Sequence, residues 1–132
     1  MKKTMIRIDV DGTVTSIPNK GLGSLQEAVG GYVEAVGCGD THAAYLNEEG
    51  KLIGLPVNVV ATRVWCLMNA TSAQNPPDLL CGPVVIVRVV DDAGEHDGED
   101  YSPAQVVWDA IGQVKDMDKT KTVYLKSPPE LN

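Results

Sequence analysis

The residues whose types and spacing could do chemistry lie near the start of the chain. Asp9 and Asp11 follow an alternating, β-prone run, and Gly12-Thr13 comes directly after them. Two carboxylates at the end of a strand can hold Mg²⁺, and one carboxylate can act as a nucleophile. The dipeptide Asp-Gly between two β-prone runs is also a common hairpin turn. This stretch is therefore compatible with an enzyme site or with a turn.

The pattern D-x-D-G-T resembles the nucleophile loop of haloacid-dehalogenase-type phosphatases. The resemblance implies Asp9 as nucleophile, Asp11 as general acid and Mg²⁺ beside them, with the carboxylates of 91–92 as a further metal-binding end. It also implies a doubly wound parallel sheet and a phosphate pocket completed by a Ser or Thr and a Lys. Residues 13–17 instead have the pattern of an immediate return strand. We therefore favour the turn and expect no enzyme, and pairing of 13–17 with 4–10 would contradict the phosphatase hypothesis.

Other groups with metal-ligand chemistry lack the spacing that a metal site needs. Cys38, Cys66 and Cys81, together with His42, offer enough ligands for Zn²⁺, but no two cysteines form a C-x₂₋₄-C pair. We expect three reduced, buried thiols. The acidic stretch 91–100 does not match an EF-hand loop, which favours a solvated loop. No metal or other cofactor is expected.

The composition indicates one globular domain without nucleic-acid or membrane partners. The chain has 132 residues, of which 43% are hydrophobic and 22% charged, as in soluble globular proteins. Its net charge is −7, and six of its 18 acidic residues lie in 91–100. Phosphate binding needs a basic stripe, which this sequence does not contain. No apolar run is long enough to cross a bilayer, so we expect a cytoplasmic protein.

Hydrophobic periodicity predicts elements in the order β-β-α-β-β-α-β-α-β. Strands are expected over 4–10, 13–17, 42–46, 51–55, 84–90 and 122–125. Ser24 to Glu27 has the pattern of a capping box, which begins a helix that runs through Gly30-Gly31 to Val36. Asn58 is placed to cap a second helix over 59–69, and a third helix is expected over 102–116.

Hairpins in place of β-α-β crossovers favour the α+β class, with a mostly antiparallel sheet and two to three helices. We expect a single domain over 1–132 with a frayed tail over 127–132.

Three segments resemble, in order, the small phage and actinobacterial family known as domain of unknown function 3846. They are LQEAVGGYVE at 25–34, NEEGKLIGLPVN at 47–58 followed by Ala61-Thr62, and GPVVIV at 82–87. The resemblance covers about 5–90, and the helix and strand expected in 102–126 lie beyond it. The N-terminal strand of that family is a simple strand and turn, which supports the hairpin. The resemblance implies small proteins, often carried by phages, that commonly bind host components.

We therefore expect a non-enzymatic binding protein of phage or mobile-element type that acts on a host protein. The alternatives are sequestration of a small, nucleotide-like ligand and a Mg²⁺-dependent phosphohydrolase that uses Asp9 and Asp11. A homodimer would cover the sheet edges and helix faces of so small a domain. The nearest candidates for a partner-binding or ligand-binding site are Gly30, Gly31, Tyr32, Glu34, Asn58, Arg63 and Trp108. A helix cap at Asn58 and packing contacts at the two glycines are the structural alternatives.

Overall fold

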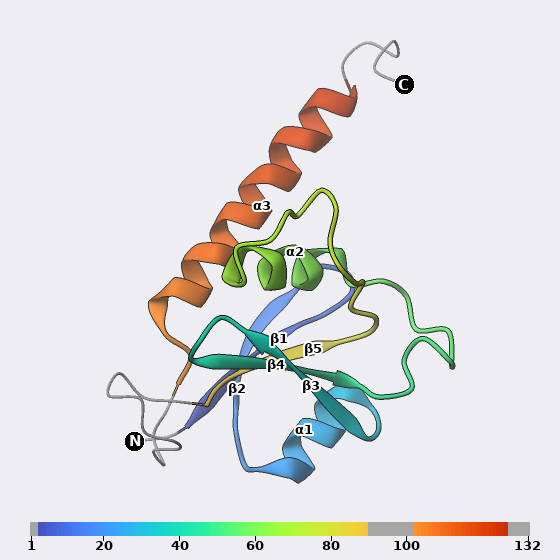
Figure 1. Cartoon of the computed structure of the whole chain (residues 1–132), viewed down its shortest axis with the longest axis vertical. Coiled ribbons are helices and arrows are strands. Elements are labelled where there is room, and N and C mark those ends of the chain that lie inside the picture. The colour runs from blue at the N-terminus through green and yellow to red at the C-terminus, as the bar shows by residue number, and fades with distance from the viewer. Residues whose placement is uncertain (1–2, 90–101, 127–132) are drawn as a thin grey trace.

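The computed structural model describes residues 3–89 and 102–126, with side chains of the last helix as far as residue 117 (Figure 1). Its elements are β1 (Thr4–Ile8), β2 (Val14–Pro18), α1 (Leu22–Val29), β3 (Val33–Cys38), β4 (His42–Asn47), α2 (Val59–Met68), β5 (Val84–Arg88) and α3 (Gln105–Lys126). The acidic stretch 91–100 and the tail 127–132 lie outside the described residues.

The strands form a five-stranded sheet in the order β2-β1-β5-β4-β3, in which every neighbouring pair is antiparallel. The prediction of an α+β fold with an antiparallel sheet is confirmed. Strand β5 lies at the centre, and its residues are buried on both faces because helices cover each side. The edges of the sheet are β2 and β3.

The helices form a layer on each face of the sheet (Figure 1). Helices α2 and α3 pack against each other over one face, and α1 covers the other. Alternation along β1 follows from these layers: Ile6 and Ile8 join the core under α2 and α3, whereas Met5 joins the core under α1. None of the helices described here combines the length and the apolar character that a membrane span requires.

The predicted hairpin at the start of the chain is confirmed. Ile8 lies opposite Val14, and the Asp9 amide donates to the Thr13 carbonyl at 2.9 Å. Gly12 has φ of +90°, which a residue with a side chain rarely adopts. Residues 13–17 thus return directly along 4–8.

The first helix was predicted wrongly at both ends. It begins at Leu22, where the Ser24 hydroxyl bonds to the Gly21 carbonyl instead of forming a capping box. It ends at Val29 because Gly30 adopts φ of +79°, and the amides of Gly30 and Gly31 both donate to the Gln26 carbonyl. The bond from Gly31 is the long-range bond of a Schellman motif and the bond from Gly30 is that of an αL motif, and both are typical of the end of a helix.

Residues 33–38, of which 33–36 were expected to be helical, form β3 and pair with β4, so the second hairpin lies one segment earlier than predicted. Two segments that were predicted as strands, 51–55 and 122–125, are not strands. Residues 51–55 lie in turns, where the Leu55 amide donates to the Gly50 carbonyl at 2.8 Å. Residues 122–125 belong to α3, which continues to Lys126. The predicted order of elements holds through α3, although different segments provide β3 and β4.

Candidate functional site

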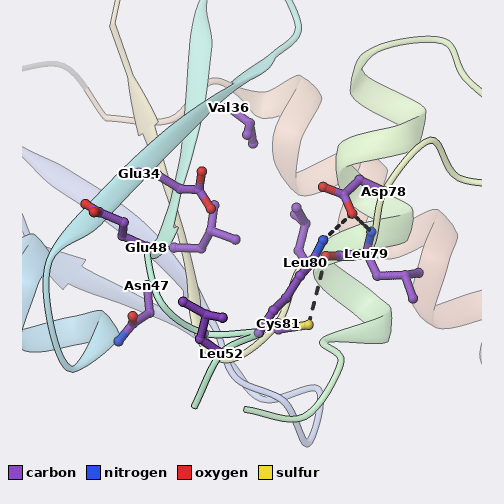
Figure 2. A pocket seen from close by; sticks show the side chains of 12 residues that line it. Glu34, Val36, Asn47, Glu48, Leu52, Asp78, Leu79, Leu80 and Cys81 are labelled. Carbon is purple, nitrogen blue, oxygen red and sulfur yellow. Dashed lines mark hydrogen bonds and ion pairs between the residues drawn. The ribbon is translucent and has the colours of Figure 1, made fainter. Parts of the chain in front are cut away.

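A cavity of about 110 Å³ opens at the end of the β3–β4 hairpin (Figure 2). It is lined by Glu34, Val36, Leu46, Asn47, Glu48, Gly50, Lys51, Leu52, Asp78, Leu79, Leu80 and Cys81. These residues come from β3, from β4 with the turn after it, and from the segment that leads into β5. Two of the segments that carry the family resemblance therefore meet here, 25–34 and 47–58.

Asn47 holds the turn that forms one wall of the cavity. Its side-chain oxygen accepts from the Glu49 amide at 2.8 Å, and its side-chain nitrogen donates to the Val29 carbonyl at 3.2 Å. A Cβ at Gly50 would lie 3.3 Å from the carbonyl oxygens of both Asn47 and Cys81, so the two walls approach each other tightly at this glycine. The turn is therefore fixed against both the end of α1 and the opposite wall.

Residues 78–81 form the opposite wall. Asp78 accepts from the Leu79 amide at 2.8 Å and forms an ion pair with Lys51, which links the two walls. The hydrogen bond from Lys51 lowers the pKa of Asp78, and the same bond raises the pKa of Lys51. Each of the two side chains is 58% exposed, so solvent screens the pair, and its main effect is to position Lys51.

The cavity has an apolar floor and a charged mouth. The buried side chains of Leu46 and Leu80 supply the floor, while the Glu34 and Asp78 carboxylates lie on opposite sides of the opening (Figure 2). Glu34, Glu48 and Asp78 place three carboxylates around this cavity against one lysine.

Exposed apolar side chains extend the site beyond the cavity. Leu52 is 86% exposed, Ile53 58% and Leu79 45%. Leu52 and Ile53 are adjacent in one turn, and Leu79 stands on the opposite wall. Exposed apolar side chains on both walls of a small cavity are typical of a protein-binding surface.

The structure separates the residues predicted for a site. Glu34 lines the cavity, and the neighbouring Tyr32 is 70% exposed, with its carbonyl bonded to the Glu48 amide at 2.8 Å. Gly30 and Gly31 end α1, and a Cβ on Gly31 would lie 2.9 Å from the Asn47 side chain. The glycines therefore support the cavity wall without lining it.

The other predicted site residues do not line the cavity. Asn58 is fully buried as the cap of α2, and Arg63 lies on α2, where it already interacts within the chain. Trp108 is 37% exposed on α3. Sequence reasoning missed Lys51, Leu52 and Asp78, although Leu52 and Ile53 in a polar turn segment were a visible signal.

Asp9 and Asp11 both serve the first hairpin. Asp9 forms an ion pair with Arg7 at 2.9 Å, and Asp11 accepts from the Thr13 amide at 2.9 Å. This hydrogen bond from Thr13 lowers the pKa of Asp11. The return strand follows at once, and the sheet is antiparallel, so the fold expected around a phosphatase nucleophile loop is not present here. Residues 91–92 lie outside the described part of the chain.

All three thiols are buried and free, as predicted. Burial raises the pKa of the Cys38 thiol to about 12. Among the described residues, no three Cys, His, Asp or Glu side chains gather where they could share a metal ion.

His42 is buried on β4 and connects the sheet to α3. Its Nε2 accepts from the Ala104 amide at 3.1 Å, so its Nδ1 carries the proton and donates to the Thr41 hydroxyl at 2.9 Å. Burial, aided by the positive charge of Arg88, lowers the pKa of His42 to about 4. This histidine is therefore neutral at pH 7.

Comparison with known proteins gives one match. The sequence model of a family described as Domain of unknown function (DUF3846) matches residues 1–111, which extends the resemblance into the first turns of α3. No curated protein and no solved structure matches the chain.

Proposed function

Because the chain belongs to the family described as domain of unknown function (DUF3846), we propose its function from its own site: it is a non-enzymatic binding protein that recognises a protein partner. The partner is a protein of the host cell, and the binding takes place in the cytoplasm. The resemblance to small phage proteins supports a role in host takeover or counter-defence.

The size of the cavity carries this proposal. Pockets for small ligands and cofactors usually enclose about 300–1,000 Å³, whereas a cavity of about 150 Å³ already holds benzene. The cavity beside Glu34 measures about 110 Å³, which suits one aliphatic side chain and is too small for a nucleotide at this site, although wider hollows of about 520 and 380 Å³ lie elsewhere, beside α3 and beside α1. Leu52, Ile53 and Leu79 around it offer apolar contact area that a protein surface could bury.

Charge supports the same kind of partner. The carboxylates of Glu34, Glu48 and Asp78 repel phosphate groups and attract Lys or Arg side chains. The ion pair between Lys51 and Asp78 offsets one of these carboxylates, and Glu34 and Glu48 keep the charge around the cavity negative. We therefore propose a partner that presents an apolar side chain next to a basic one.

The test is a selection of random short peptides for binding to the full chain, followed by affinity measurements with paired variants. Leu52→Asp and Glu34→Lys alter the site, and we expect each to weaken binding by about tenfold or more. Leu22→Asp and Glu27→Lys make the same changes at exposed positions of α1, and we expect binding close to wild type. Equal losses in both pairs, or no peptide binding at all, would overturn the proposal.

A second measurement addresses the small-ligand alternative. The purified protein is denatured, and the released small molecules are identified by mass spectrometry. We expect no stoichiometric compound. A nucleotide-sized compound recovered in a one-to-one ratio would favour sequestration of a small ligand.

A further inference from the structure

Strand β3 is an edge of the sheet, and its outward backbone groups can be identified from the register. The Glu48 amide bonds to the Tyr32 carbonyl, which makes Tyr32 and Glu48 a hydrogen-bonded pair in the ladder. Hydrogen bonds alternate along an antiparallel ladder, so Glu34 and Val36 also bond to β4. The N–H and C=O groups of residues 33, 35 and 37 therefore point away from the sheet.

The end of this edge near α2 is closed. The Trp65 indole N–H donates to the Gly37 carbonyl at 2.8 Å, and the Asn69 side chain donates to the same oxygen at 2.9 Å. Within the described residues, no hydrogen bond reaches the outward groups of Val33 or Ala35. The open part of the edge is thus 33–36, and Ala35 at its centre is exposed.

Two side chains of this open part, Glu34 and Val36, face the candidate site. Glu34 lies opposite Leu46 and Val36 opposite Ala44, so both lie on the α2 side of the sheet, where both line the cavity. A strand added along β3 would meet Glu34 and Val36 at non-hydrogen-bonded positions, where facing side chains approach most closely. One face of such a strand would therefore lie over the cavity.

We propose that the partner binds by adding an extended segment to β3, antiparallel to it, with its backbone bonded to Val33 and Ala35. An apolar residue of this segment, opposite Val36, fills the cavity, and a Lys or Arg two residues later lies opposite Glu34. The recognised segment thus has the pattern apolar-x-basic. This inference rests on the proposed function and specifies how the partner is bound.

The charges disfavour a second copy of the chain as the added strand. Neither edge strand, β2 (Val14–Pro18) or β3 (Val33–Cys38), contains a Lys or Arg that could lie opposite Glu34. Pairing of β3 with itself would bring two Glu34 side chains to the same face of one sheet. A segment from another protein meets the charge requirement without this cost.

The test uses proline substitutions at outward positions of the two sheet edges. Ala35→Pro removes an outward N–H of β3 and no bond to β4, and Ser16→Pro makes the same change on β2, whose bonded residues are 13, 15, 17 and 19. Selected peptides should carry the apolar-x-basic pattern. We expect Ala35→Pro to weaken their binding by about tenfold or more, and Ser16→Pro to leave it unchanged.

Amide hydrogen exchange on the wild-type protein gives an independent readout. Without peptide, the amides of Val33 and Ala35 should exchange fast and those of Glu34 and Val36 slowly. With peptide bound, the amides of Val33 and Ala35 should slow by at least about tenfold.

The outcomes separate this inference from the proposed function. If binding is lost in Leu52→Asp but Ala35→Pro has no effect and the outward amides stay fast, strand addition is wrong and the binding function stands. If no peptide binds, both fail. If sedimentation shows a dimer that Ala35→Pro dissociates, the edge is occupied by a second copy and the inference is overturned.

Discussion

Asn58 is fully buried, and every polar atom of its side chain is bonded. Its oxygen accepts from the Ala61 amide at 3.0 Å, and its nitrogen donates to the carbonyls of Ile8 at 2.8 Å and Gly82 at 2.9 Å. One side chain thereby caps α2 and connects it to β1 and to the segment before β5. The sequence predicted the cap, while the two carbonyl bonds depend on the tertiary structure.

We expect Asn58→Ala to lower the free energy of unfolding by about 3 kcal/mol, because it removes the cap of α2 and the two buried hydrogen bonds that the side chain donates to the Ile8 and Gly82 carbonyls. Urea unfolding followed by circular dichroism measures this. Asn69→Ala is the matched control at the other end of α2, where the residue is exposed, and should cost less than about 1 kcal/mol. Similar losses in the two variants would contradict the role of Asn58.

Because buried His42 is neutral in the folded protein, we expect the protein to lose stability in acid. Its pKa is about 4 in the folded protein and about 6.5 when exposed, so the unfolded chain binds more protons between these values. The stability from neutral His42 is therefore complete above about pH 6.5 and is lost as the pH falls through 4, by on the order of 2 kcal/mol. Unfolding measured from pH 7 to pH 4.5 should show this slope, and His42→Gln should flatten it. An unchanged slope in the variant would assign the effect to other groups.

At the scale of elements, Gly30 and Gly31 decide where α1 ends and β3 begins. The apolar positions 25, 28, 29, 32, 33 and 36 have helical spacing, so periodicity alone predicted one long helix. Gly30 ends it by adopting a positive φ, and the residues after it pair with β4. The candidate site was only partly predictable from the sequence. Glu34 belongs to a segment that carries the family resemblance, whereas Asp78 pairs with Lys51 only because the fold brings distant segments together.

Glycine substitutions in α1 test this account of its end. Gly30→Ala should destabilise the protein by about 1 kcal/mol, because a side chain is strained at φ of +79°. Gly23→Ala, within the helix and facing open space, should stabilise it by about 0.5–1 kcal/mol. Thermal unfolding distinguishes the two, and a stabilising Gly30→Ala would show that α1 can continue past Val29.

At the scale of the whole molecule, the sheet is covered on both faces and α3 extends beyond the layers it packs on (Figure 1). Val114 is the last residue of α3 that is described as buried, one turn beyond the end of the family match. The prediction of an α+β fold succeeded because strand alternation and the cap at Asn58 are local signals. The helix layers on the two faces of the sheet, and the cavity, arise from packing between distant segments, so local signals did not predict them.

The three cysteines differ in how far their side chains are buried. Cys38 and Cys66 are completely buried, whereas Cys81 is 6% exposed and lines the cavity. We expect a small methylating thiol reagent to modify Cys81 at least about tenfold faster than the other two, which should react only when the protein unfolds. Mass spectrometry of the intact protein, with Cys81→Ser as the control, measures this order. Equal rates for the three thiols would contradict the prediction that the reagent reaches Cys81 through the cavity.

The bond from the Trp65 indole to the Gly37 carbonyl also places a light-emitting group at the sheet edge. Indole emission depends on the hydrogen bond of the ring and on its contact with water. Anything that docks beside β3 would therefore alter the fluorescence of the protein without an added dye. Since Trp108 is the only other tryptophan, a Trp108→Phe chain would carry a single natural reporter at the place where binding is proposed.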